Sequence, residues 1–298
     1  MAISLTILMD GLIYAAWLFV VALGMTLIFG VMRILNVAHG SFYAFGAYTM
    51  ATLLNLITGA GLPFAYGFLA IPLAALAVGG GLGTMMETGV LRWLHGRDEV
   101  AAALATFALF LILEDMVPLI WGLDAIPTYQ IYGVLGTTDI GGMIFNNYEL
   151  SFILLAIVVG AITWWGLRHT RQGKIVLAVI HDPEAAQAFG INVRRVFPTV
   201  FAIGGVLGAL AGAYSAPMIT VYPGIGVEAV ILAFAVVVIG GLGSVPGAMI
   251  GALAVGLARA VAVHLLPQVE LFVIYSVMTL VLLFRPSGLF AKPVARRI

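Results

Sequence analysis

The sequence predicts an all-α membrane protein that crosses the bilayer about nine times. Of its 298 residues, 63% are hydrophobic and only 9% are charged, and the mean hydropathy is +1.15. Water-soluble domains are about 45–50% apolar and about 25% charged. A chain of this composition cannot fold as an ordinary water-soluble enzyme, and we expect a single transmembrane domain over residues 1–298.

The rest of the composition narrows the chemistry and the partners. The 13 basic residues balance the 13 acidic ones, so no nucleic-acid partner is expected, and the chain has no cysteine. The absence of cysteine excludes disulfides, thiol nucleophiles and cysteine-based metal sites. The 36 glycines make up about 12% of the chain, against a usual value of about 7%. Because small residues let membrane helices approach closely, this predicts a tightly packed bundle.

Nine apolar runs approach the length of about 20 residues that crosses the hydrocarbon core. They lie near residues 7–30, 41–58, 64–90, 100–121, 149–168, 197–219, 227–241, 246–266 and 269–285. The first run is too long for a cleavable signal and no Lys or Arg precedes it, so we expect it to be retained. The seventh run is short and ends in two glycines. A count of eight to ten spans therefore stays open, with 36–41 or 240–247 as alternative re-entrant segments.

The basic residues predict the orientation of these spans. Twelve of the 13 fall in the first, third and fifth connections and the C-terminal tail, namely Arg33, Arg92, Arg97, Arg168, Arg171, Lys174, Arg194, Arg195, Arg285, Lys292, Arg296 and Arg297. With nine spans all of these lie on one side, and cytoplasmic loops carry the excess of Lys and Arg. The loop 122–148 on the other side has Asp124 and Asp139 but no Lys or Arg. We therefore predict an N-terminus outside the cytoplasm, periplasmic or extracellular, and a cytoplasmic C-terminus.

The largest cytoplasmic connection, residues 168–196, contains the signals of a short capped helix. Asp182 is a good N-cap, Pro183 suits the first helical position, and Glu184 lies at the positive end of the helix. Gly190 suits a left-handed C-cap. These residues predict a helix of about two turns over 183–189. Two interpretations are open at this point: a docking element for a soluble partner, or a surface turn that links two spans.

Polar groups and glycines inside or between the spans are the candidates for a translocation path. They are Asn36, His39, Ser41, Glu114, Glu228, Gly240, Gly241 and Ser244. Charged groups within spans usually face a bundle interior or a cavity, and paired helix breaks mark the pathway in repeat-built transporters. The alternative is a purely structural role in turns and helix packing. Arg259 is expected to have a structural role, either pairing with one of the intramembrane carboxylates or extending toward the outer interface, with a substrate contact as the less favoured alternative. His39 has no second ligand at metal-binding spacing, so no metal site is predicted.

Four stretches resemble the permease subunits of branched-chain amino acid ABC importers, specifically the LivH type. They are 36–41 with 46–48, the loop around 182–192, Gly226-Val227-Glu228, and the glycine-rich string 239–248. The glycine-rich string is the most specific of the four. Together the stretches span nearly the whole chain, and the resemblance implies a multi-pass protein of the bacterial inner membrane that transports amino acids.

The resemblance also implies partners and a docking site. The loop looks like the coupling helix that fits a groove of the ATP-binding subunit, with His181, Asp182, Pro183, Glu184, Ala185, Ala186, Phe189 and Gly190 as the docking residues. It implies a second, LivM-like permease subunit, two ATP-binding subunits and a periplasmic binding protein. Independently, the chain has no G-x-x-x-x-G-K-[ST] phosphate loop, and its lysines are Lys174 and Lys292. We therefore expect no cofactor and no enzyme activity in this chain, with ATP and Mg²⁺ bound by the partners.

Alternative functions remain at this stage. Similar permeases also serve urea, short amides and aromatic acids, and the sequence does not separate these substrates. An ion-coupled secondary transporter would place several ionisable groups at the membrane midplane, where this chain has few. An intramembrane enzyme lacks support, because no His-Glu-x-x-His or paired catalytic Asp motif is present. Whether the permease core pairs two different chains or two copies is also open, and the family implies different chains.

Overall fold

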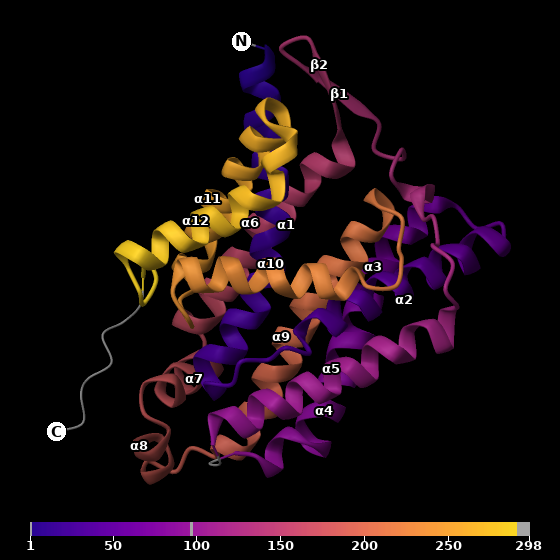
Figure 1. Ribbon diagram of the computed structural model, residues 1–298. Coiled ribbons are helices and arrows are strands. Elements are labelled where there is room, and N and C mark those ends of the chain that lie inside the picture. The colour runs from indigo at the N-terminus through magenta and orange to yellow at the C-terminus, as the bar shows by residue number, and fades with distance from the viewer. Residues whose placement is uncertain (1, 96–97, 291–298) are drawn as a thin grey trace.

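The computed structural model describes residues 2–95 and 98–290 and is almost entirely helical (Figure 1). Its α-helices are α1 (Ala2–Met32), α2 (His39–Gly59), α3 (Gly67–Ala75), α4 (Gly83–Gly89), α5 (Glu99–Trp121), α6 (Asn147–His169), α7 (Arg171–His181), α8 (Pro183–Ala188), α9 (Val193–Ser215), α10 (Ile225–Gly240), α11 (Val245–Leu265) and α12 (Glu270–Phe284). Strands β1 (Thr137–Ile140) and β2 (Met143–Asn146) form an antiparallel hairpin. A π-helical stretch, Leu76–Leu82, joins α3 to α4.

A helix lies at each of the nine predicted runs, but the described residues support six spans. Six helical segments are long and apolar enough to cross a membrane, namely Ile3–Met32, Phe64–Trp93, Glu99–Trp121, Asn147–His169, Val193–Met218 and Val245–Leu265. Helices α10 and α12 have only 16 and 15 residues. Helix α2 has 21 residues but carries polar side chains such as His39, Tyr43 and Tyr48. The protein is therefore a multi-pass membrane protein, while the nine-span count and the orientation stay predictions.

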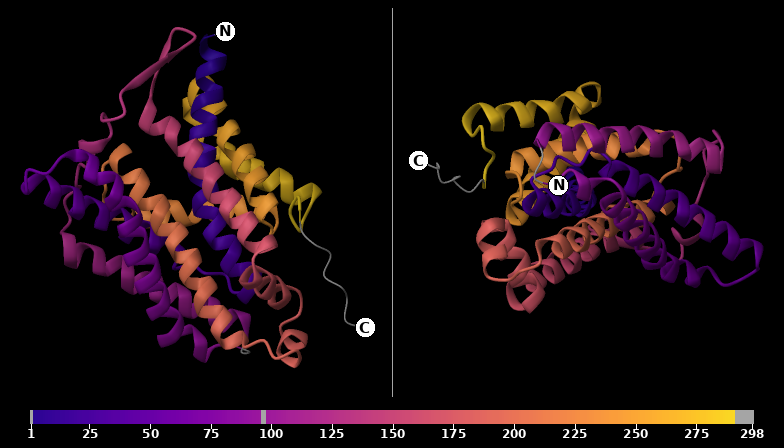
Figure 2. Two further views of the ribbon diagram at one scale, coloured as in Figure 1. Left: turned by 180° about the vertical axis from the view of Figure 1, so that it is seen from behind. Right: turned by 90° about the horizontal axis from the view of Figure 1, so that it is seen from below.

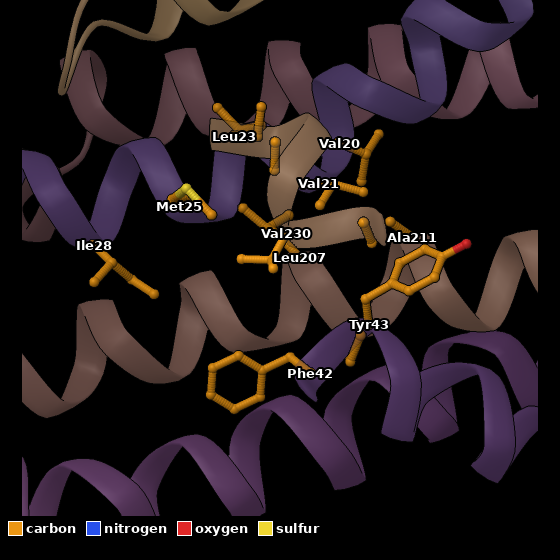
Figure 3. Close-up of a cluster of buried hydrophobic side chains, with 14 of the residues drawn as sticks. Val20, Val21, Leu23, Met25, Ile28, Phe42, Tyr43, Leu207, Ala211 and Val230 are labelled. Carbon is orange, nitrogen blue, oxygen red and sulfur yellow. The ribbon is translucent and has the colours of Figure 1, made fainter. Parts of the chain in front are cut away.

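Helix α1 is the centre of the bundle. Its 31 residues give a length of about 46 Å, more than the ~30 Å of a hydrocarbon core. It packs against α6, α9, α10 and α11, so its apolar surface is covered on several sides, as expected for a helix without a polar face. Figure 3 shows the resulting core, in which side chains of α1 meet those of α2, α9 and α10, among them Val20, Leu23, Ile28, Phe42, Leu207 and Val230.

The two predicted interruptions are present. Between α1 and α2, residues 33–38 form a loop that is hydrogen-bonded to α5. Thr106 Oγ1 of α5 accepts from the Val37 amide at 3.2 Å and donates to the Leu35 carbonyl at 3.0 Å. Between α10 and α11, Gly241 and Gly243 adopt positive φ angles of 99° and 78°. At the first break, a neighbouring helix therefore satisfies exposed backbone groups.

Helix α7 and the two strands β1 and β2 were not predicted from the sequence. Helix α7 occupies the first part of the connection 168–196 and folds back against α6. The hairpin β1–β2 turns at Gly141 and Gly142, whose φ angles of 64° and 82° suit a two-residue hairpin turn. Figures 1 and 2 show this hairpin beside the N-terminus, with α7 and α8 at the opposite end of the bundle. Of the basic residues that predicted the orientation, Arg97, Lys292, Arg296 and Arg297 lie outside the described residues.

Candidate functional site

The short helix α8 forms at the predicted place, one residue shorter than expected. The Asp182 carboxylate accepts from the amides of Glu184 and Ala185 at 3.0 and 2.9 Å, and Gly190 follows with a φ of 81°. His181, Asp182 and Glu184 are exposed, whereas Ala186 is buried against the bundle. The Phe189 ring is 88% exposed. One face of α8 therefore packs on the protein, and the other presents charged groups and an aromatic ring.

Removing the cap of α8 is expected to loosen this helix. Replacing Asp182 with Ala removes both side-chain hydrogen bonds to the first turn, and a lost N-cap costs about 1 kcal/mol. The backbone amides of Glu184 and Ala185 should then exchange hydrogen roughly fivefold faster. Hydrogen exchange followed by mass spectrometry measures this. The Asp182→Asn variant keeps a capping oxygen and should behave like the wild type; equal acceleration in both would contradict the capping role.

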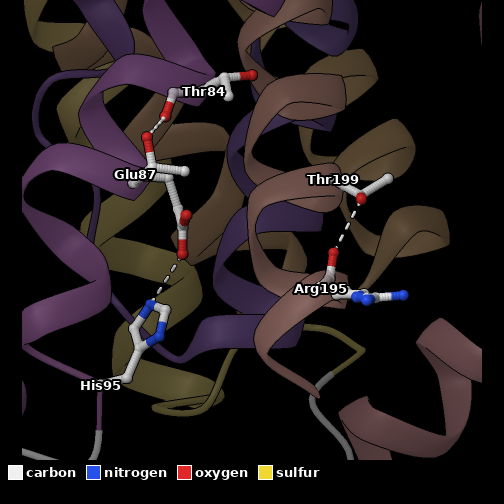
Figure 4. A network of polar contacts seen from close by, with 6 residues as sticks. Thr84, Glu87, His95, Arg195 and Thr199 are labelled. Carbon is white, nitrogen blue, oxygen red and sulfur yellow. Dashed lines mark hydrogen bonds and ion pairs between the residues drawn. The ribbon is translucent and has the colours of Figure 1, made fainter. Parts of the chain in front are cut away.

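A small cavity of about 200 Å³ lies beneath α8. It is lined by the end of α1, the residues after α4, the start of α5, and parts of α7, α8 and α9, including Met32, His95, Val179, Pro183 and Phe197. Beside it, His95 Nε2 contacts Glu87 Oε1 at 3.3 Å (Figure 4), and the His95 ring packs edge-on against Phe197. Burial lowers the pKa of His95. Six segments of the chain thus meet where α8 joins the bundle.

A larger cavity of about 420 Å³ lies toward the N-terminal end of α1, where its wall combines aromatic rings with charged groups. Helix α1 contributes Asp10, Tyr14 and Trp17, and other elements contribute Tyr43, Glu149, Phe152, Ser215, Tyr222, Glu228 and Arg259. The volume falls within the range of about 300–1,000 Å³ that is usual for small-ligand sites. We call it the outer cavity, because the N-terminus is predicted to lie outside the cytoplasm. It is the larger of the two cavities described here and the better candidate for contact with a small molecule.

Most of the charged groups of the outer cavity are already bound to protein partners. Arg259 forms an ion pair with Glu270, and its guanidinium lies 4.0 Å from the centre of the Tyr14 ring. Asp10 Oδ2 lies 2.7 Å from Nε2 of His264. Glu149 accepts a hydrogen bond of 2.5 Å from the Tyr132 hydroxyl. Glu228 accepts a hydrogen bond from the Tyr222 hydroxyl.

The residues predicted as candidates for the translocation path lie in different surroundings. Only Glu228 lines the outer cavity. Asn36 and Ser41 are buried, and their side chains have no hydrogen-bond partner among the described residues. Glu114 accepts from the Gly224 amide and so joins α5 to the loop before α10. Gly240 and Gly241 are buried at the break before α11, where Ser244 accepts from the Gly247 amide at 3.2 Å.

His39 is placed in the core rather than at a cavity. Its side chain is fully buried, and Nε2 lies 3.0 Å from the Val21 carbonyl oxygen of α1. A side chain at Gly24 or Gly208 would meet the imidazole ring, at 2.8 and 3.0 Å for a Cβ atom. The ring therefore fills a space that glycines on α1 and α9 leave open, which favours the structural interpretation of this residue.

Truncating His39 is expected to destabilise the bundle. The His39→Ala variant leaves a cavity among α1, α2 and α9 and removes the contact with Val21, so the free energy of unfolding should fall by about 2–4 kcal/mol. Denaturant titration of the protein in detergent measures this. The exposed His169 is the matched control, and His169→Ala should change stability by less than about 0.5 kcal/mol. Unchanged stability combined with impaired transport would instead support a pathway role for His39.

Two pairings differ from the expectation or were missed. Arg259 was expected to bind an intramembrane carboxylate such as Glu114 or Glu228, but its partner is Glu270 at the start of α12. The reason is tertiary: α11 and α12 pack as an antiparallel pair, which brings positions 259 and 270 together. The contact between Asp10 and His264 was also missed, because it joins residues 254 positions apart.

The fold is that of a multi-pass helical membrane protein, and comparison with known proteins gives its class and its family. Residues 7–282 match the family described as branched-chain amino acid transport system / permease component. The chain belongs to that family, which confirms the resemblance drawn from its glycine-rich string and the loop around 182–192.

Individual relatives are similar in sequence to this chain over most of its length. It is 29% identical to the high-affinity branched-chain amino acid transport system permease protein BraD of Pseudomonas aeruginosa, across 98% of this chain and 97% of the relative. It is 26% identical to the corresponding protein LivH of Escherichia coli, across 93% and 92%. The ribose import permease protein RbsC of Haemophilus influenzae is 29% identical across 80% and 71%. No solved structure matches the chain.

Proposed function

We propose that this chain is the transmembrane permease subunit of a binding-protein-dependent ABC importer for branched-chain amino acids, located in a bacterial inner membrane. The observation that carries the proposal is the family match over residues 7–282. Nearly full-length similarity to permeases named for branched-chain amino acid transport supports the substrate class. The partners are a second permease subunit, two ATP-binding subunits that hold ATP and Mg²⁺, and a periplasmic binding protein.

Helix α8 supports the coupling step of this proposal. It is short, capped and exposed on one face, and it contacts both α7 and α9. Helix α7 in turn packs on α1 and α6, and α9 packs on α1 and α2. A displacement of α8 by an ATP-binding subunit therefore reaches the centre of the bundle through two helices. ATP binding would drive the exchange between outward-open and inward-open states, with no chemistry in this chain.

The proposal is tested with the assembled complex. The chain is co-expressed with neighbouring permease and ATP-binding subunits, and ATP hydrolysis is measured with and without loaded binding protein. We expect a complex whose ATPase activity rises with leucine-loaded binding protein and is uncoupled by Glu184→Arg. Stimulation by urea-, amide- or aromatic-acid-loaded binding protein instead would revise the substrate. Purification as a lone chain that transports solute in liposomes without ATP would overturn the importer and favour a secondary transporter.

A further inference from the structure

We propose that the outer cavity is a transient binding site for the transported amino acid, in which the Glu228 carboxylate receives the α-ammonium group. This inference rests on the proposed transport function and adds to it a contact point inside the permease. Three observations carry it: the position of Glu228, the charge balance of the cavity, and the aromatic rings beside it.

Glu228 is placed to meet a ligand. It lies in the first turn of α10, its side chain is exposed, and it forms part of the wall of the 420 Å³ cavity. Its protein partner is the neutral hydroxyl of Tyr222. A carboxylate has about four acceptor positions, so one hydrogen bond leaves room for further donors.

The charge balance of the cavity favours a cationic group. Its wall holds three carboxylates, on Asp10, Glu149 and Glu228, against the guanidinium of Arg259. Arg259 is neutralised by Glu270, and Asp10 faces His264. None of the ion pairs within residues 2–95 and 98–290 involves Glu228. An ammonium group at Glu228 would supply the missing positive charge, whereas a second anion there would be repelled.

The aromatic wall suits the same ligand. The rings of Tyr14 and Trp17 lie 5.2 Å apart between centroids, and those of Trp17 and Tyr43 lie 5.9 Å apart, so three neighbouring rings line the cavity. Arg259 already lies over the Tyr14 ring, which shows that this wall accepts a cation. Beyond the rings, Ile13, Phe152 and Leu232 offer an apolar surface to a branched aliphatic side chain.

The absence of cysteine from the chain allows a direct test of the charge. The Glu228→Cys variant carries the single thiol of this chain. It is assayed in the complete importer, in proteoliposomes with loaded binding protein. Leucine transported per ATP hydrolysed should fall about tenfold, the effect expected for one lost charged hydrogen bond. Modification with a sulfonatoethyl thiosulfonate, which restores a negative charge, should recover most of the ratio. The trimethylammonium reagent, which adds a positive charge, should not.

The controls separate this inference from the proposed function. The reagents should not affect the wild-type complex, and this control accounts for thiols on the partner subunits. They should also not affect the Asp124→Cys variant, because Asp124 is an exposed carboxylate that lines neither cavity. If the cysteine variant does not assemble, the nearly isosteric Glu228→Gln is measured in the same way. A wild-type ratio in the variant, or equal effects of both reagents, would overturn the ammonium site and leave the importer intact. Failure of the wild-type complex to transport leucine with ATP would overturn the proposed function itself.

Discussion

Replacing Phe189 with Ala is expected to weaken the binding of the ATP-binding subunit to this permease at least 30-fold. Phe189 is 88% exposed at the end of α8. Contact between an apolar ring and water is unfavourable, so covering this ring with a partner surface lowers the free energy. Aromatic anchors in docking interfaces typically contribute about 2 kcal/mol or more, which corresponds to about 30-fold in affinity. Titration of the ATP-binding subunit onto the permease complex in nanodiscs measures the dissociation constant.

The control for this variant is another exposed phenylalanine. Phe284 lies at the end of α12 and is 77% exposed, so Phe284→Ala removes the same group from a different surface. We expect its affinity for the ATP-binding subunit to match the wild type. Equal affinity of the Phe189 variant and the wild type would show that α8 docks without this ring, or that it is only a surface turn.

Replacing Gly212 with Val is expected to prevent stable packing of α2 against α9. A Cβ atom at Gly212 would collide with the main-chain oxygen of Tyr43, and one at Gly46 would collide with the backbone of Ala209. The two helices therefore touch backbone to backbone. Separating them would also break the hydrogen bond of 2.7 Å between Tyr43 and Ser215. A loss of about 3 kcal/mol is a large share of the stability of a domain, so little folded protein should be recovered.

Yield and size-exclusion profile after extraction from the membrane measure this loss. Gly166 provides a matched control, because it lies inside α6 and a Cβ atom there would have no neighbour within 4 Å. The Gly166→Val variant therefore changes the same residue types without a collision. Similar yields for the two variants would show that the close approach of α2 and α9 is not required.

Features that depend on local sequence were predictable. The length and apolarity of the runs located the helices, because a chain in lipid must satisfy its backbone internally. The N-cap at Asp182 and the left-handed turn at Gly190 depend on their own residues and near neighbours, and both are present. The hairpin at Gly141 and Gly142 carried the same kind of signal and was missed because it lies in a loop between membrane spans.

Features that depend on distant residues required the structure. The described residues support six spans rather than nine because α2 is too polar, and α10 and α12 are too short, to meet the length and hydropathy of a span; the nine-span count stays a prediction. For His39 the sequence left a structural role and a lining role open, and the glycines of α1 and α9 that enclose its ring favour the structural one. The outer cavity brings together residues from the two ends of the chain, from Asp10 to Arg259, and no sequence spacing indicates such a set.

By itself, the sequence determined that this protein is a multi-pass helical permease with a short capped helix in its largest basic connection. These properties follow from composition, run length and capping residues, which act over a few turns of helix. Only the tertiary structure decided which polar groups face a cavity, which ones pair with each other, and which glycines bring two backbones together. Such contacts depend on how α1 packs against helices from the whole chain, and the physical reason is that packing joins residues without regard to their separation in sequence.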